Sequence, residues 1–391
     1  MSRSSRSTPI ASGTPHARPA SIFNPVIDFL LVGGLSLIVL VPLLLSGRTD
    51  LLFVSAGAQA LIATAINMPH FMASYRLVYG SRDMILRHKW ASIYVPAILV
   101  AYIALALWDA QNSDAQHPPA LAIILIAVAS GYLAWHYTGQ VWGMMASFAY
   151  LGGMRFERVE RLLIRSGLRI LLAWHVTWFL YTQLQNAELV RPLYVLISSA
   201  TIAAFLLGVV GLLLMRRRVG RLPPARALVA WLAIFVWYAA MARDPRALFW
   251  VQIAHALQYL AFPVRVEMNR TSREASASPY RVALHMAGYG AILLAVSIGV
   301  AQLVPMSAMG VVGNMFGEQP GRAAPILLLM FINIHHYFTD GVIWKISNAE
   351  VRRDLFAHVP RADVPASGGS ITSAERGRGL VSRKPGVEAP R

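Results

Sequence analysis

The strongest constraint on this chain is a series of apolar segments, each about as long as a bilayer core is thick. A helix needs roughly 20 apolar residues to cross a hydrocarbon core of ~30 Å. Only 14% of the residues are charged and 56% are hydrophobic, which leaves too little charge to cover a soluble bundle. The sequence therefore predicts an all-α, polytopic integral membrane helical bundle of about ten transmembrane helices. The predicted segments are 27–46, 51–75, 92–109, 119–150, 167–187, 192–215, 227–242, 246–263, 282–304 and 323–345.

The distribution of basic residues predicts the orientation of these helices. If the N-terminus lies in the cytoplasm, 30 of the 35 Lys and Arg residues fall in cytoplasmic segments and five in the opposite loops. Cytoplasmic loops of membrane proteins carry such an excess of Lys and Arg. Both termini are therefore expected in the cytoplasm, with the protein in an inner (plasma) membrane of bacterial type. Topology and anionic lipid account for the net charge of +17, so no nucleic-acid partner is expected.

The composition divides the chain into three regions. Residues 1–26 form a polar arm that lacks the apolar core of a signal peptide, and 27–345 form the transmembrane domain. Residues 346–391 form a basic, largely disordered cytoplasmic tail, because they contain too few apolar residues to build a core. The chain has no cysteine, which excludes disulfides, iron–sulfur clusters and thiolate zinc sites.

Histidines inside the apolar segments are the main functional signal, because ionisable side chains are costly in hydrocarbon. The second, fourth, eighth and tenth segments carry them, and all four segments are expected to run from outside to inside. Imidazoles that converge from several helices at similar depth suit a buried transition metal. Two adjacent histidines point ~100° apart around a helix, so one of the last pair is expected to face the centre. The predicted metal ligands are His70, His136, His255, His335 and His336.

Polar residues four positions after these histidines support a shared centre. Asp340 follows His336 at this spacing and lies on the same helical face. It is predicted to be either a carboxylate ligand or a catalytic group that orients an imidazole or acts as a base. The competing interpretation for any single membrane histidine is a hydrogen bond between helices, and we favour that interpretation for His175.

Short motifs resemble the Brp/Blh family of bacterial β-carotene 15,15′-dioxygenases. They are Pro69-His70, His136-Tyr137, His255, and His335 with Asp340. The third motif of that family usually carries two histidines four residues apart, whereas Tyr259 occupies the second position here. The resemblance implies a non-haem iron held by histidines and the oxidation of an apolar substrate.

Three functional hypotheses follow from these observations. The first is a membrane oxygenase that uses histidine-bound iron on a lipid-like or isoprenoid substrate taken from the bilayer. The second is a haem-binding or electron-transfer protein, because two histidines on facing helices can hold one haem. The third is a transporter whose intramembrane polar residues form a pathway. Membrane lipid and an apolar small molecule are the expected partners, and the sequence predicts no oligomeric state.

Overall fold

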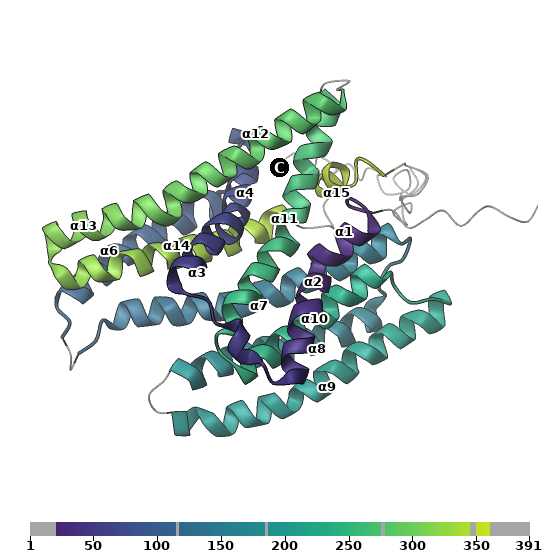
Figure 1. Ribbon diagram of the computed structural model, residues 1–391, viewed down its shortest axis with the longest axis horizontal. Helices are drawn as coiled ribbons and strands as arrows, with labels where there is room; N and C mark the ends of the chain where they lie inside the picture. Colours follow the sequence, from purple (N-terminus) through teal and green to yellow (C-terminus); the bar gives the residue numbers. More distant parts are fainter. Residues whose placement is uncertain (1–20, 115–116, 184–186, 275–277, 345–348, 360–391) are drawn as a thin grey trace, which may run out of the picture.

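The computed structural model describes residues 21–114, 117–183, 187–274, 278–344 and 349–359 (Figure 1). Every regular element in these ranges is a helix, and four long helices are built from α and π segments. The first of these composite helices joins α1 (Pro25–Phe29), η1 (Leu30–Gly34) and α2 (Leu35–Ser46), and the second joins α3 (Ala56–Ile62), η3 (Ala63–Asn67) and α4 (Met68–Tyr79). The third joins η4 (Trp90–Tyr94) and α6 (Val95–Gln111), and the fourth joins α12 (Pro279–Ile298), η5 (Gly299–Leu303) and α13 (Val304–Phe316).

The other long helices are continuous α-helices. They are α7 (Ala120–Leu151), α8 (Arg158–Gln183), α9 (Ala187–Val219), α10 (Ala225–Arg243), α11 (Ala247–Glu274) and α14 (Glu318–Ile343). Three short elements complete the described chain: the 3-10 turn η2 (Thr49–Leu52), α5 (Arg82–Arg87) and α15 (Ala349–Leu355).

Eight of these helices are long and apolar enough to cross a membrane, judged by length and composition. This agrees with the predicted all-α, multi-pass architecture. Two predicted segments, 51–75 and 167–187, are helical over most of their described length but are not among the eight. Both carry polar residues inside the bundle, which lowers their mean hydropathy.

Three of the π turns end just before a proline. η3, η4 and η5 each end two residues before Pro69, Pro96 and Pro305 respectively. A proline inside an α-helix clashes with the carbonyl group four residues earlier, and a wider π turn moves that carbonyl away. The extra residue of a π turn also rotates everything after it by ~100° relative to a regular helix. Thus η3 sets the direction in which His70 points.

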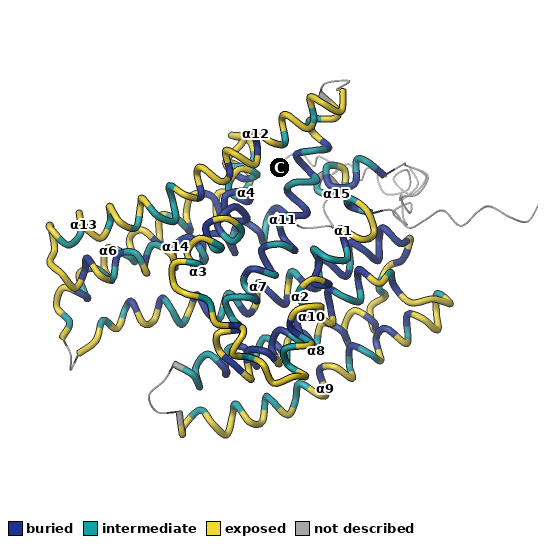
Figure 2. The backbone as a smooth tube through the Cα atoms, viewed as in Figure 1, coloured by how far each residue is buried: buried dark blue, intermediate teal, exposed yellow. Residues whose placement is uncertain are grey.

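Buried residues concentrate on the inner helices α4, α7, α10 and α11, whereas α9, α12 and α13 are mostly exposed along their outer faces (Figure 2). α4 packs against both α11 and α14, and α14 also packs against α7. The four helices α4, α7, α11 and α14 therefore meet in the interior. They contain all five predicted histidine ligands, two of which are the adjacent pair on α14.

The structure differs from the prediction at the beginning of the predicted cytoplasmic tail. α15 packs against α11, and Leu355, Phe356 and Val359 are buried in the same cluster as Ile22. Residues 349–359 therefore belong to the folded body, since this short segment buries enough apolar surface to attach to it. Residues 360–391 lie outside the described residues, as do residues 1–20 of the predicted arm.

A buried ion pair joins α1 to α10. Asp28 accepts a 3.0 Å contact from Arg226, with both side chains no more than 7% exposed, and it also accepts the backbone N–H of Ile22. Removing one partner of a buried pair leaves the other charge unpaired at a cost of about 3–5 kcal/mol. We expect Asp28→Ala to lower the free energy of unfolding in detergent by about that amount. Denaturant unfolding followed by helical circular dichroism would measure it.

The matched control for this prediction is Asp50→Ala, which breaks the exposed pair between Arg48 and Asp50. Exposed pairs contribute roughly 0–1 kcal/mol, so this variant should unfold close to the wild type. Equal effects from the two variants would contradict a structural role for the Asp28–Arg226 pair.

Candidate metal centre

Four imidazoles from four different helices meet in the interior. His70 comes from α4, His136 from α7, His255 from α11 and His336 from α14. All four side chains are buried, with residue exposures between 0% and 5%. Around the cluster, neighbouring ring centroids lie 4.7 Å (His70 to His336), 5.0 Å (His336 to His136), 4.8 Å (His136 to His255) and 5.6 Å (His255 to His70) apart.

Each of the four rings has a buried nitrogen with no hydrogen-bond partner in the described part of the chain. The Nε2 atoms of His70, His136, His255 and His336 are all in this state, and so is Nδ1 of His255. Leaving a buried polar atom unpaired costs free energy, so native proteins rarely do so without a reason. Several such nitrogens in one cluster are a donor set that a metal ion could use.

The second nitrogen is already engaged on two of the rings. Nδ1 of His70 contacts the carbonyl oxygen of Asn67. A carbonyl only accepts, so this nitrogen carries the proton and Nε2 presents a lone pair. Nδ1 of His336 lies 2.9 Å from the Ser74 hydroxyl, which donates to Asp340. With the Ser74 proton donated to Asp340, the same hydroxyl can accept from Nδ1–H, and in that tautomer Nε2 of His336 presents a lone pair as well.

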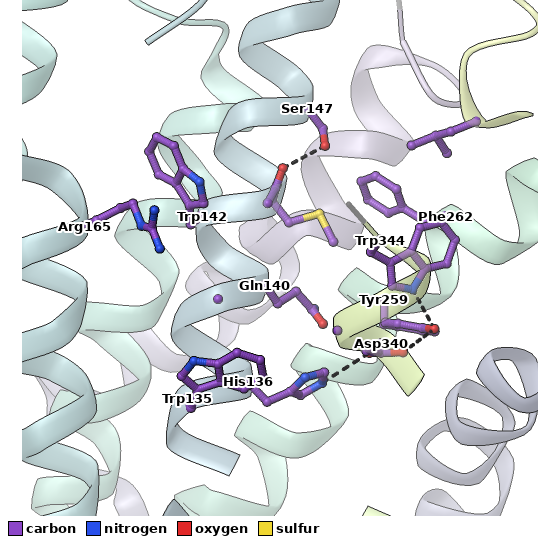
Figure 3. A pocket seen from close by; sticks show the side chains of 15 residues that line it. Trp135, His136, Gln140, Trp142, Ser147, Arg165, Tyr259, Phe262, Asp340 and Trp344 are labelled. Atoms are coloured by element: carbon purple, nitrogen blue, oxygen red, sulfur yellow. Dashed lines mark hydrogen bonds and ion pairs between the residues drawn. The ribbon is translucent and has the colours of Figure 1, made fainter. Parts of the chain in front are cut away.

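Asp340 is held in a fixed direction at the edge of the cluster. Its Oδ1 accepts hydrogen bonds from the hydroxyls of Tyr259 at 2.8 Å and Ser74 at 3.0 Å. The indole N–H of Trp344 donates to the Tyr259 hydroxyl at 2.7 Å. The other oxygen, Oδ2, faces His136 (Figure 3) and also lies close to His336. One carboxylate oxygen is therefore anchored, and the second is available at the centre.

The spacing around Oδ2 fits a metal ion. It lies 3.2 Å from Nε2 of His336 and 3.6 Å from Nε2 of His136. The three ligand atoms that these side chains offer all lie within 4.8 Å of one another. Ligands bound tetrahedrally at ~2.1 Å stand about 3.4 Å from each other. The group His136, His336 and Asp340 could thus hold a metal ion with little movement.

His335, a predicted ligand, is not part of this cluster. Its Nε2 lies 3.0 Å from the Tyr79 hydroxyl and 3.1 Å from the carbonyl oxygen of Ala91, and its ring stacks on Tyr75. The carbonyl contact requires a proton on Nε2, so this nitrogen offers no lone pair. Of the adjacent pair, His336 faces the centre and His335 links α14 to the helix that contains η4.

Sequence analysis missed Ser74, which contacts both His336 and Asp340. A signal for it exists, because Ser74 follows His70 by four residues. The same spacing relates His136 to Gln140, His255 to Tyr259 and His336 to Asp340. Each histidine of the cluster therefore has a polar neighbour one turn further along its own helix.

Other polar residues near the cluster connect helices to each other. Gln140 donates to the side-chain carbonyl of Gln258 at 3.2 Å, and Gln258 donates to the backbone carbonyl of Val32 at 2.6 Å. His175 contacts the Tyr238 hydroxyl at 3.1 Å, the kind of hydrogen bond between helices favoured for it above.

A cavity of about 290 Å³ borders the centre, and both His136 and Asp340 form part of its wall (Figure 3). Much of the remaining wall is apolar, with Trp142, Phe262 and Trp344 among its residues. This volume lies close to the lower end of the range for small-molecule pockets. A molecule in this cavity would touch the same side chains that could hold a metal.

The chain was compared with models of protein families, with curated proteins and with solved structures, and none of the three comparisons gave a match.

Proposed function

We propose that this protein is a membrane-embedded oxygenase that uses a histidine-bound, non-haem iron to oxidise a lipid-like or isoprenoid substrate. The observation that carries the proposal is the set of buried, unpartnered imidazole nitrogens around the free oxygen of Asp340. The ligands we assign are His70, His136, His255 and His336, with Asp340 either as a fifth ligand or as the group that orients them.

The composition of the innermost group favours iron. Two histidines and one carboxylate, here His136, His336 and Asp340, are the ligand set of many non-haem Fe(II) oxygenases. The motif resemblance to the Brp/Blh family supports the same metal. Haem is disfavoured because the four rings contact one another, which leaves no space for a macrocycle between any facing pair.

The residues around the centre suggest how the reaction would be supported. The assigned histidines and Asp340 would hold the iron, and iron held there would supply the activation of O₂. Tyr259 and Ser74 hold Asp340 by two donated hydrogen bonds, so the carboxylate keeps one orientation throughout a reaction. The four imidazoles and Asp340 are at most 8% exposed, which limits the contact of bulk water with reactive species. An apolar substrate bound in the adjoining cavity would lie next to His136, which forms part of the cavity wall.

The topology that accompanies this function has ten crossings, with both termini in the cytoplasm and the protein in a bacterial-type inner membrane. The support is the segregation of basic residues in the sequence, which alternates at every loop only if ten segments cross. The two crossings beyond the eight apolar helices would be α3–η3–α4 and α8. The first of these carries His70.

Metal analysis of the purified protein is the direct test. We expect close to one equivalent of iron per chain and an absorption spectrum without the Soret band of haem. Addition of O₂ to the Fe(II) form in the presence of membrane lipid extract should yield oxidised lipid products by mass spectrometry. Protein that takes up no transition metal after purification and reconstitution would refute the proposal, and a Soret band would point to the haem alternative.

A further inference from the structure

The cavity beside the centre has a shape that suits an extended chain. It follows α7, where Gly139 and Gly143 form part of its wall one turn apart. A Cβ atom built on either glycine would meet nothing within 4 Å, so the wall is open at both positions. Trp135 and Arg165 also line the cavity and are exposed, so it reaches the protein surface.

Among the described residues that line this cavity, Arg165 is the one with a cationic side chain. It comes from α8, and its guanidinium carbon lies 6.0 Å from the centroid of the Trp142 ring (Figure 3). No carboxylate in the described part of the chain forms an ion pair with it. By contrast, Arg218 on the neighbouring helix α9 pairs with Glu160 at 2.8 Å. The guanidinium of Arg165 is therefore available to bind an anionic ligand.

We propose that this cavity binds a single-chain amphiphile with an anionic head, and this inference rests on the function proposed above. The guanidinium of Arg165 holds the carboxylate or phosphate head, because its planar donors match such groups. The apolar chain lies over the open faces of Gly139 and Gly143 and ends or passes beside His136 and Asp340. A cavity of about 290 Å³ has room for one chain and not for the two chains of a phospholipid.

This arrangement predicts which part of the chain lies beside His136 and Asp340. Trp142, which lies under Arg165, follows His136 by six residues on α7, a rise of roughly 9 Å along the helix. The head would therefore be anchored at about that distance from His136. The carbons beside His136 and Asp340 lie in the interior of the chain, neither next to the head nor, in a long chain, at its end.

Binding of palmitate to the full-length protein in nanodiscs of zwitterionic lipid tests this proposal. We expect saturable binding whose Kd rises about tenfold or more in Arg165→Gln, because a charge-assisted hydrogen-bond pair is lost. Arg169→Gln, on the same helix one turn away, is the matched control and should bind palmitate as the wild type does. Hexadecanol, which lacks the charge, should compete poorly. Comparison of palmitate with hexadecyl phosphate identifies the preferred head.

Gly143→Leu is an independent variant that places a side chain into the open cavity. It should weaken palmitate binding about tenfold or more while the iron content stays unchanged, because no assigned ligand is touched. Equal palmitate affinity in the wild type and Arg165→Gln would overturn the proposal, as would equal losses in Arg165→Gln and Arg169→Gln. Binding is measured without turnover, so a protein that lacks iron but binds palmitate through Arg165 would refute the oxygenase and leave this site standing.

Discussion

Alanine in place of His136 is expected to lower the iron content of the purified protein from near one equivalent by about tenfold or more. His136 belongs to the innermost group, and its Nε2 lies 3.6 Å from the free oxygen of Asp340. Its removal takes away one of the two imidazoles of the innermost group and leaves only His336 and Asp340 in it. Inductively coupled plasma mass spectrometry on detergent-purified protein, normalised to protein concentration, measures the effect.

His335→Ala is the matched control for this experiment. It removes an imidazole from the same region of α14, but that ring bonds to Tyr79 and Ala91 instead of facing the cluster. Its iron content should equal that of the wild type, although its stability should fall because of the lost hydrogen bonds. A wild-type iron content in His136→Ala, or an equal loss of iron in both variants, would show that the cluster is not the iron-binding site.

Asparagine at position 340 is expected to weaken iron binding by about 10–100-fold. The substitution keeps the size of the side chain, and its carbonyl oxygen can still accept from Tyr259 and Ser74. The amide nitrogen that then faces His136 and His336 is a poor ligand and carries no charge. Competition against a chelator of known affinity gives the change in Kd for iron.

Tyr259→Phe distinguishes the contribution of the Asp340 carboxylate as a metal ligand from the contribution of its fixed orientation. This variant keeps the carboxylate and removes one of the hydrogen bonds that orient it. Its loss of iron affinity should be smaller than that of Asp340→Asn. If Asp340→Asn binds iron as tightly as the wild type, the carboxylate is neither a ligand nor an orienting group.

The helical architecture was accessible from the sequence because it depends on the average polarity of about twenty residues at a time. The histidines were found for a related reason, since a buried imidazole stands out among apolar neighbours. Eight predicted segments correspond closely to helices able to cross a membrane. For the segment that contains His70, the structure adds a π turn that averages of polarity do not reveal.

The direction in which a side chain points around its helix was much harder to predict. The ~100° between His335 and His336 indicated that one faces inward, but not which one. That choice depends on the rotation of α14 against α4 and α7, which packing of many side chains decides together. Ser74 was missed because a lone serine in a membrane helix is common and carries no charge. Its importance is visible only when the hydroxyl is seen between His336 and Asp340.

The four helices that form the cluster are far apart in the sequence, and this has a consequence for biosynthesis. Ser74 and Asp340, which touch in the finished protein, are 266 residues apart in the chain. Because a nascent chain emerges N-terminus first, the ribosome must complete α14 before His336 and Asp340 can join the other three imidazoles. If the centre binds a metal as proposed, capture would come after insertion of α14 and would join the four helices that carry the ligands, so a loaded centre would mark a chain that has finished both synthesis and packing.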